Sequence, residues 1–205
     1  YSFVKSGANG RISRFRFNST MSLPGRYIYI KDKDTNDYWS ASWQPVGKPL
    51  DKYKSECRHG TAYTVISSEY EKISAQTAYY VPNGKTYEVW RAKITNNDSK
   101  ERNLSVTGFV EFTNEDNYEQ DQVNLQYSLF ISQTKLEGNK IVQIIRKKRK
   151  KDRRDRFFGM TGAEVTGACG DLNKFTGAYR TYSNPEGIEK GLDGSMNYNS
   201  NSCGA

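Results

Sequence analysis

The chain has 205 residues, a length that suits one all-β domain or a part of a larger one. Aromatic residues make up 13% of it, with 15 Tyr and 9 Phe, a composition that favours strands and excludes a disordered chain. The formal net charge is +8, and no apolar run approaches the roughly 20 residues that a membrane helix needs.

The first expected strand covers residues 26–30, directly after a Pro24-Gly25 turn. Farther along, Trp39 and Trp43 lie four residues apart on a presumed strand, so both side chains point to one face. Aromatic rings on one face suit either a sugar-stacking platform or a sandwich core. We expect core packing for both, and for Trp43 in particular, because Pro45 follows it closely and rigidifies the strand end.

A strand is also expected around the segment Cys57-Arg58-His59-Gly60, where the chain carries its single imidazole. The two-residue spacing places Cys57 and His59 on the same face of that strand. A Cys–His nucleophile needs hydrogen-bond geometry and an activated thiol, and the sequence shows neither. We therefore expect a structural role, with Gly60 relaxing the backbone and His59 bonding a neighbouring loop.

Apolar and polar residues alternate with a period of two in the next segments, which predicts an antiparallel all-β fold. The alternation covers residues 73–81, 90–94 and 104–112. Turn sequences separate these segments: Pro82-Asn83-Gly84-Lys85 is typical of a hairpin loop, and Asn96-Asn97-Asp98-Ser99 joins the next two strands. Because strand side chains alternate between faces, each segment can bury one side and expose the other.

Acidic residues are the candidates for glycoside chemistry, since hydrolysis usually needs two carboxyl groups that flank the bond. Glu111 falls on the polar face of the strand over residues 104–112. Glu115-Asp116 and Glu119-Gln120-Asp121 follow in the next loop. Nothing in the sequence places two of these groups across a sugar, so we interpret the segment as a solvated acidic loop.

Alternation returns over residues 125–132, and a dense basic run follows from Arg146 to Arg156. This run holds nine cations and two anions, so it contributes +7 of the net charge of +8 and leaves +1 for the rest of the chain. It contains no aromatic side chain for base stacking, and like charges this dense repel each other and extend the chain. A solvated loop between strands is expected; adventitious polyanion binding and a local sequence aberration stay open.

Beyond residue 159 the Gly- and Asn-rich sequence predicts long loops with short strands.

Other chemical sites find little support. Cys57, Cys169 and Cys203 are widely spaced and odd in number, which indicates reduced thiols in the cytosol rather than a disulfide framework. With one His, neither a zinc site nor another cofactor is expected, and there is no P-loop or GxGxxG motif for nucleotides. The start at Tyr1 shows no initiator Met and no signal peptide, and we expect one domain over residues 1–205 that is cut at both ends.

Four motifs together resemble one known family. They are Ser42-Trp43-Gln44-Pro45-Val46-Gly47, Cys57-Arg58-His59-Gly60-Thr61-Ala62-Tyr63, Phe109-Val110-Glu111-Phe112 and Tyr179-Arg180-Thr181-Tyr182-Ser183-Asn184-Pro185. In this order they resemble the N-terminal β-sandwich domain of the cellobiose and cellodextrin phosphorylase family, and residues 121–127 resemble its cellodextrin branch. The resemblance implies an antiparallel super-β-sandwich of the galactose-mutarotase-like type, incomplete at both ends.

Members of this family are inverting glycoside phosphorylases, which cleave a β-glucoside with inorganic phosphate to give α-glucose 1-phosphate. Because phosphate supplies the attacking oxyanion, the reaction needs one protein carboxylic acid to protonate the leaving oxygen. In the family that acid belongs to a later (α/α)6 barrel, so no catalytic residue is assigned in this chain, and the chain alone is expected to be inactive. The resemblance also implies a cytoplasmic homodimer in which this domain covers the active site.

The resemblance places the substrate contacts in the loop after Phe112, over about residues 113–127, which in the family reaches over the neighbouring subunit's active site. Cellobiose-type members have an arginine near the end of this loop, where this chain has Gln126. The departure puts an ionic contact in doubt. Asn124 and Gln126 are therefore the candidate neutral hydrogen-bond partners of a β-glucan oligosaccharide.

Other functions stay open. The chain suits a self-standing carbohydrate-binding β-sandwich module, or a fragment of a laminaribiose-type phosphorylase, since glycosidic linkage and acceptor length depend on barrel residues outside it. Its charge also suits a nucleic-acid-binding β protein. Binding without sequence preference that vanishes when residues 146–156 are deleted would show that such binding is adventitious. Specific nucleic-acid and membrane partners are not expected.

Overall fold

A computed structural model describes residues 10–14, 24–114, 119, 121, 130–146, 155–198 and 200–205. Strands predominate in these ranges, and every strand pair with an assigned register is antiparallel, so the all-β antiparallel prediction is confirmed. The chain divides into two compact units, which are described separately. Unit 1 comprises Tyr1–Arg26 and Thr107–Ala205, and unit 2 comprises Tyr27–Val106. That the whole chain acts as one domain stays a prediction.

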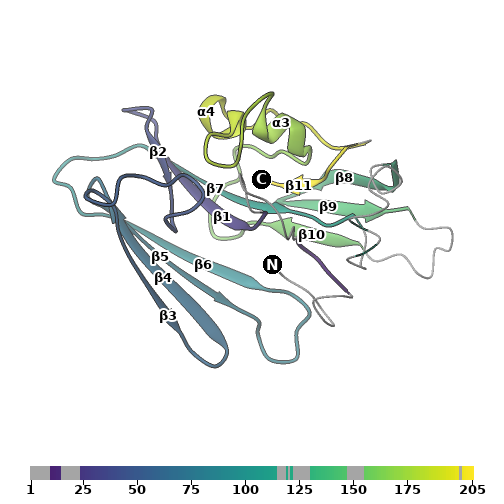
Figure 1. The fold of residues 1–205 in the computed structure, drawn as a ribbon, viewed down its shortest axis with the longest axis horizontal. Coiled ribbons are helices and arrows are strands. Elements are labelled where there is room, and N and C mark those ends of the chain that lie inside the picture. The colour runs from purple at the N-terminus through teal and green to yellow at the C-terminus, as the bar shows by residue number, and fades with distance from the viewer. Residues whose placement is uncertain are drawn as a thin grey trace. The chain divides into compact units, whose positions relative to one another are not determined.

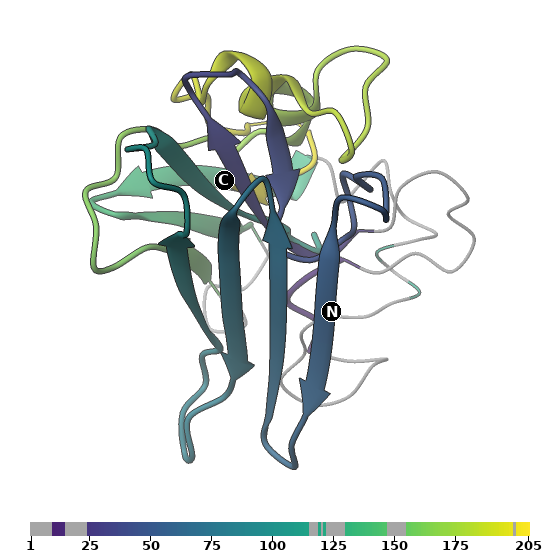
Figure 2. The ribbon, with the colours of Figure 1, turned by 90° about the vertical axis from the view of Figure 1, so that its left-hand side faces the viewer.

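Unit 2 is built from two groups of strands. A four-stranded antiparallel sheet connects neighbouring strands in chain order, and Figure 2 shows it from one side. In a second group β1 lies between β2 and β7, and β7 continues into unit 1. The strands are β1 (Arg26–Asp32), β2 (Tyr38–Ser40), β3 (Lys54–His59), β4 (Tyr63–Tyr70), β5 (Ile73–Tyr80), β6 (Val89–Asn96) and β7 (Leu104–Glu111).

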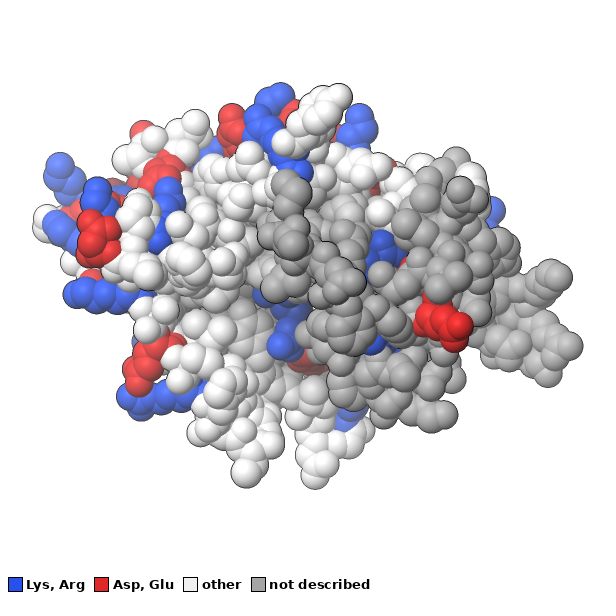
Figure 3. All heavy atoms as spheres, in the orientation of Figure 1, with Lys and Arg blue, Asp and Glu red and all other residues white. Residues whose placement is uncertain are grey.

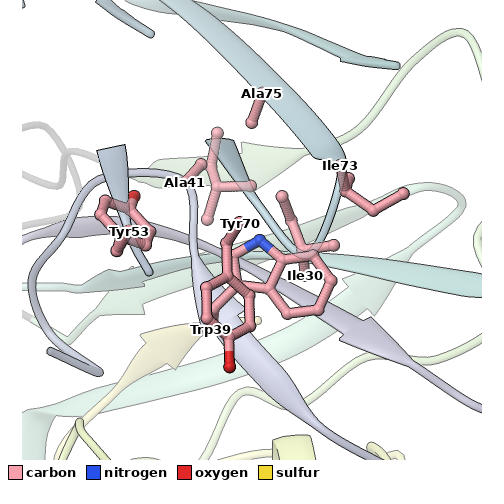
Figure 4. Close-up of a cluster of buried hydrophobic side chains, with 8 residues drawn as sticks. Ile30, Trp39, Ala41, Tyr53, Tyr70, Ile73 and Ala75 are labelled. Carbon is pink, nitrogen blue, oxygen red and sulfur yellow. The ribbon is translucent and has the colours of Figure 1, made fainter. Parts of the chain in front are cut away.

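The alternation expected over residues 73–81 is confirmed in β5, where every second side chain is buried. The buried face joins residues of β1, β2 and β4 in one hydrophobic cluster (Figure 4). Trp39 lies within it at 1% exposure, with its ring centroid 5.2 Å from that of Tyr70. The buried members are Ile28, Ile30, Trp39, Ala41, Tyr53, Tyr70, Ile73 and Ala75.

Trp43 does not share this environment, so the prediction that it fills the core is wrong. The strand ends at Ser40, and Trp43 lies in the turn that follows, where its side chain is 37% exposed. Its indole N–H donates to the carbonyl oxygen of Lys48 over 2.7 Å. The two tryptophans therefore never share a strand face, because the strand is too short to carry both.

Within unit 2, an ion pair joins the end of β1 to the segment that precedes β7. Asp32, at the end of β1, is fully buried, and the Arg102 guanidinium donates to its carboxylate from the segment before β7. Burial by itself raises the pKa of Asp32, but the hydrogen bonds from Arg102 and from the backbone N–H groups of Asp34 and Thr35 outweigh it, so this pKa lies below its ordinary value. Asp32 is thus held as an anion.

Unit 1 holds a three-stranded sheet in the order β10-β9-β8, and a short strand, β11, that pairs with the end of β7 (Figure 1). The hairpin that β8 and β9 form was not predicted. The strands are β8 (Ser132–Glu137), β9 (Lys140–Ile145), β10 (Arg156–Gly159) and β11 (Cys203–Gly204).

Two short helices, α3 (Leu172–Thr176) and α4 (Glu186–Lys190), lie where the sequence predicted only loops and short strands, so that prediction is wrong there. Local signals account for both. The Asp171 carboxylate caps α3 by accepting from two backbone N–H groups of its first turn, and Gly177 ends it at a φ of 81°. Pro185 precedes α4, and Gly191, at a φ of 101°, follows it.

The end of β7 is buried on both faces. Phe109 stacks on Phe175 of α3 at 4.5 Å between ring centroids, and Val110, Glu111 and Phe112 are also buried. The prediction that Glu111 lies on a solvent-facing side is therefore wrong. Alternation indicates which side chains share a face, but here protein covers both faces, so a carboxylate is enclosed.

The ring of Phe158, on β10, packs where two strands carry no side chain. A Cβ at Gly108 of β7 would lie 2.7 Å from the ring's Cζ, and one at Gly204 of β11 would lie 2.8 Å from the Cβ of Phe158. Both distances are shorter than carbon atoms tolerate. Glycine at these two positions therefore makes room for an aromatic ring.

Candidate functional site

A buried cluster of polar side chains surrounds Glu111 in unit 1. Arg14 is its only cation, and the Arg14 side chain is 1% exposed. Its Nη1 donates to Glu111 Oε1 over 3.1 Å and to Asn201 Oδ1 over 2.6 Å. Its Nε and Nη2 donate to the two carboxylate oxygens of Asp121 over 3.2 and 3.0 Å. The Tyr182 hydroxyl donates to Glu111 Oε2. We call these five residues the Arg14 cluster.

In the Arg14 cluster one guanidinium contacts two carboxylates, those of Glu111 and Asp121. Burial by itself would lower the pKa of Arg14, but Glu111 and Asp121 outweigh it and raise this pKa above its ordinary value. Arg14 therefore stays charged. The neutral Tyr182 hydroxyl adds a hydrogen bond to the Glu111 carboxylate.

The cluster ties the segment after β7 to the rest of unit 1. The backbone N–H of Asn114, three residues beyond the strand, donates to Asp121 Oδ1 over 2.9 Å. The Asn114 side chain donates to Asn201 Oδ1 over 3.4 Å. Asp121 is thus held by Arg14 and by the chain that leads into its own loop. Both carboxylates of the cluster are engaged in ion pairs and shielded from solvent, which suits an anchor and does not suit a general acid or base.

The predicted acidic loop is only partly solvated. Glu119 is exposed, as expected, but Asp121 is 1% exposed and ion-paired, so for Asp121 the prediction is wrong. Glu115 and Asp116 lie outside the described residues. So do Asn124 and Gln126, the two predicted substrate contacts, whose role stays a prediction.

The basic run joins β9 to β10, as expected for a connection between strands, and its residues 147–154 lie outside the described part of the chain. Its last residue departs from the prediction of a solvated loop. Arg156 is 7% exposed and donates to Gln143 Oε1 over 3.1 Å and to the Arg11 carbonyl oxygen over 2.9 Å. On the face in Figure 3, basic and acidic side chains of the described residues intermingle.

Cys57 and His59 share one face of β3, as predicted, with Cys57 Sγ 3.4 Å from His59 Nε2. The other ring nitrogen, Nδ1, lies 2.9 Å from Thr64 Oγ1 on β4, so His59 contacts the neighbouring strand and not the expected loop. Gly60 has a steric role at the turn between these strands. A Cβ there would lie 2.4 Å from the ring of Tyr63, and the Gly60 N–H donates to the Tyr63 carbonyl oxygen.

A shallow depression of about 480 Å³ lies on the sheet of β3 to β6. It is floored by hydroxyl, amide and charged side chains, and none of the described residues that line it is aromatic. Sugar binding through ring stacking therefore has no support at this place. The lining includes Lys54, Glu56, Ser67, Glu69, Gln76 and Lys93.

Among the described residues, no group of three or more His, Cys, Asp or Glu side chains is arranged to hold a metal ion. Within the same ranges, no helix has the length and apolar character needed to cross a membrane. The three cysteines are free thiols, with Cys57 exposed and both Cys169 and Cys203 buried.

The sequence interpretation missed Arg14 and Tyr182 as partners of Glu111, and Asn201 as another acceptor of the Arg14 guanidinium. Arg14 and Tyr182 lie 97 and 71 positions from Glu111, and Asn201 lies 187 positions from Arg14, so no local spacing connects them. One signal was present. Glu111 stands between the apolar residues Val110 and Phe112 and shares its strand face with Phe109, and a carboxylate among apolar side chains requires a buried cation or donor.

Comparison with known proteins gives a consistent result. The family model described as "Glycosyl hydrolase 94, supersandwich domain" matches residues 1–205. The chain is similar to N,N'-diacetylchitobiose phosphorylase of Vibrio proteolyticus, with 33% identity over 93% of this chain and 24% of the relative. The protein of the same name from Vibrio furnissii is 34% identical over 100% of the chain and 26% of the relative. Solabiose phosphorylase of Paenibacillus borealis is 34% identical over 54% of this chain and 13% of the relative. The chain spans about a quarter of the length of the two Vibrio relatives.

Proposed function

This chain belongs to glycosyl hydrolase family 94 as its supersandwich domain, and from this premise we propose that it is the active-site-covering N-terminal domain of an inverting β-glycoside phosphorylase. The family resemblance and the super-β-sandwich expected from the sequence are confirmed. The reaction uses inorganic phosphate as co-substrate. Its acid catalyst lies in polypeptide outside this chain.

The Arg14 cluster is the observation that carries this proposal. A domain with only a scaffolding task has no need to bury one cation and two carboxylates, since apolar side chains of similar volume stabilise a core as well or better. Here the buried charges hold Asn114 and Asp121, which belong to the segment proposed to reach the sugar. Fixed anchors at the base of a binding loop reduce the entropy that the loop loses when it binds.

The substrate proposed from the sequence resemblance is a β-glucan oligosaccharide of the cellodextrin type. A second candidate is N,N'-diacetylchitobiose. It is favoured by the two Vibrio relatives, which carry that substrate in their names and match 93% and 100% of the chain, whereas the relative named for solabiose matches 54%. Both candidates use the same arrangement of phosphate, sugar and covering domain.

Substitution of Asn124 and Gln126 by Ala in the complete protein tests the covering role. We expect KM for the sugar to rise while kcat changes little, because these side chains would bind the sugar without taking part in bond cleavage. Asn83→Ala, in the turn between β5 and β6, is the matched control and should leave KM unchanged. An unchanged KM in the double variant would remove both residues from the site.

A donor comparison distinguishes the two substrates. In the synthetic direction, the complete protein would transfer the glucosyl group of α-glucose 1-phosphate to a cello-oligosaccharide acceptor and release phosphate if it acts on cellodextrins. It would transfer the sugar of N-acetyl-α-glucosamine 1-phosphate to N-acetylglucosamine and release phosphate if it acts on N,N'-diacetylchitobiose. Release from neither donor would refute the proposed activity.

The chain by itself and the proposed assembly are tested separately. Purified residues 1–205 should release no sugar phosphate, and calorimetric titration with β-glucan would detect a self-standing binding module. We also propose that the complete protein is a cytoplasmic homodimer. Light scattering on a sizing column checks the dimer, and a monomer would contradict it.

A further inference from the structure

One thiol of this chain has a proton acceptor beside it. Cys57 and His59 lie two residues apart on β3, with Cys57 Sγ 3.4 Å from His59 Nε2. Both side chains are exposed. A thiol next to an imidazole can pass its proton to the ring, which leaves the more nucleophilic thiolate.

The neighbouring strand holds the imidazole in place. His59 is paired with Thr64 in the ladder between β3 and β4, and Thr64 Oγ1 lies 2.9 Å from His59 Nδ1. When Nδ1 carries the ring proton and donates it to the hydroxyl, the lone pair of Nε2 is directed at the Cys57 thiol. The turn that sets this pairing is closely packed, since Tyr63 covers the Cα of Gly60.

The other two thiols are shielded from solvent. Cys169 is 1% exposed and Cys203 is fully buried. Burial is the main cause that raises the pKa of Cys203 well above its ordinary value, so this thiol stays protonated as well as inaccessible. Of the three cysteines, Cys57 alone combines access from solvent with an adjacent base.

We propose that Cys57 is a site of S-thiolation by small disulfides, assisted by His59 and Thr64, independently of the proposed phosphorylase function. The Cys57 proton moves to His59 Nε2, and the thiolate attacks one sulfur of the incoming disulfide. A bond forms between that sulfur and Cys57 Sγ while the original S–S bond breaks. The second sulfur leaves as a thiolate and takes up the proton. Cys57 is oxidised to a mixed disulfide, and the incoming disulfide is reduced.

The test is a time course with glutathione disulfide on the complete protein that contains this chain. Mass spectrometry of a digest follows the adduct on the Cys57 peptide, so other cysteines do not interfere. A non-tryptic protease is needed, because cleavage at Lys54 and Arg58 would leave a very short peptide. We expect the rate at Cys57 to fall by about tenfold in His59→Gln, below the range of fully positioned acid–base groups in enzymes. Thr64→Val should also lower the rate of adduct formation at Cys57.

Ser55→Ala is the matched control, because Ser55 lies on the same exposed face of β3 and contacts neither ring nitrogen in the structure. This variant should react at the rate of the unmodified chain. Far-UV circular dichroism and the melting temperature of each variant check that it folds like the unmodified protein. A His59→Gln rate equal to that of Ser55→Ala would overturn the proposal, and so would the absence of an adduct on Cys57.

Discussion

Removal of the Arg14 guanidinium is the strongest test of how unit 1 is stabilised. In Arg14→Met the side chain keeps much of its volume but loses four hydrogen bonds, two to Asp121 and one each to Glu111 and Asn201. The buried carboxylates of Glu111 and Asp121 would then lose the guanidinium that they share. Breaking a buried ion pair in this way costs about 3–5 kcal/mol of the free energy of unfolding. That is a large part of the roughly 5–15 kcal/mol that holds a typical domain folded.

Urea unfolding followed by far-UV circular dichroism measures this loss. Indole fluorescence is unsuitable, since the three tryptophans all belong to unit 2. Hydrogen exchange at the Asn114 amide, which donates to Asp121, adds a local readout and should quicken. Arg58→Gln is the matched control. It removes an arginine from an exposed pair with Glu56 and should leave stability unchanged.

A second substitution separates electrostatics from general damage. Asp121→Asn in the Arg14→Met background removes one unpaired charge but keeps an oxygen that accepts from the Asn114 N–H. We therefore expect the double variant to recover part of the lost stability, so that the two changes are not additive. The reasoning is refuted if Arg14→Met costs no more than Arg58→Gln, or if the double variant is no more stable than Arg14→Met alone.

Three further predictions concern packing and charge elsewhere. Arg102→Gln should destabilise the chain at neutral pH, because Asp32 would lose its ion pair. The pKa of Asp32 is lower in the folded than in the unfolded chain, so the ionised carboxylate stabilises the fold above the unfolded pKa, and this stabilisation is lost as the pH falls through the folded pKa. The stability difference between Arg102→Gln and the unmodified chain should therefore shrink below about pH 4, which urea unfolding at several pH values measures. Gly108→Ala should cost about 1–3 kcal/mol by displacing the ring of Phe158, and its melting temperature should fall accordingly. Trp39→Ala should cost about 3–5 kcal/mol, because the ring is 1% exposed in the core of unit 2, and an unchanged urea midpoint would contradict that placement.

Local periodicity was sufficient for β5 and β6 of unit 2. The alternation over residues 73–81 and 90–94 and the Pro82–Lys85 turn predicted a hairpin that β5 and β6 form, with the Lys85 N–H bonded to the Pro82 carbonyl oxygen. Such signals are readable because a hairpin depends on neighbouring residues. The family motifs had the same advantage, since each is contiguous. Gly60 and Tyr63 of one motif contact each other directly.

Only the tertiary structure decided which faces are covered. Glu111 was placed on a solvent side because alternation distinguishes two faces, yet α3 packs on the face that Phe109 occupies, and Arg14 meets Glu111 from a distant segment. Trp43 was assigned to the core because its strand was expected to run on, but the strand ends at Ser40. Within a strand, the local sequence determines to which face each side chain points. Whether that face is buried depends on residues far away along the chain. A buried ion cluster is therefore the feature of this protein that periodicity could least reveal.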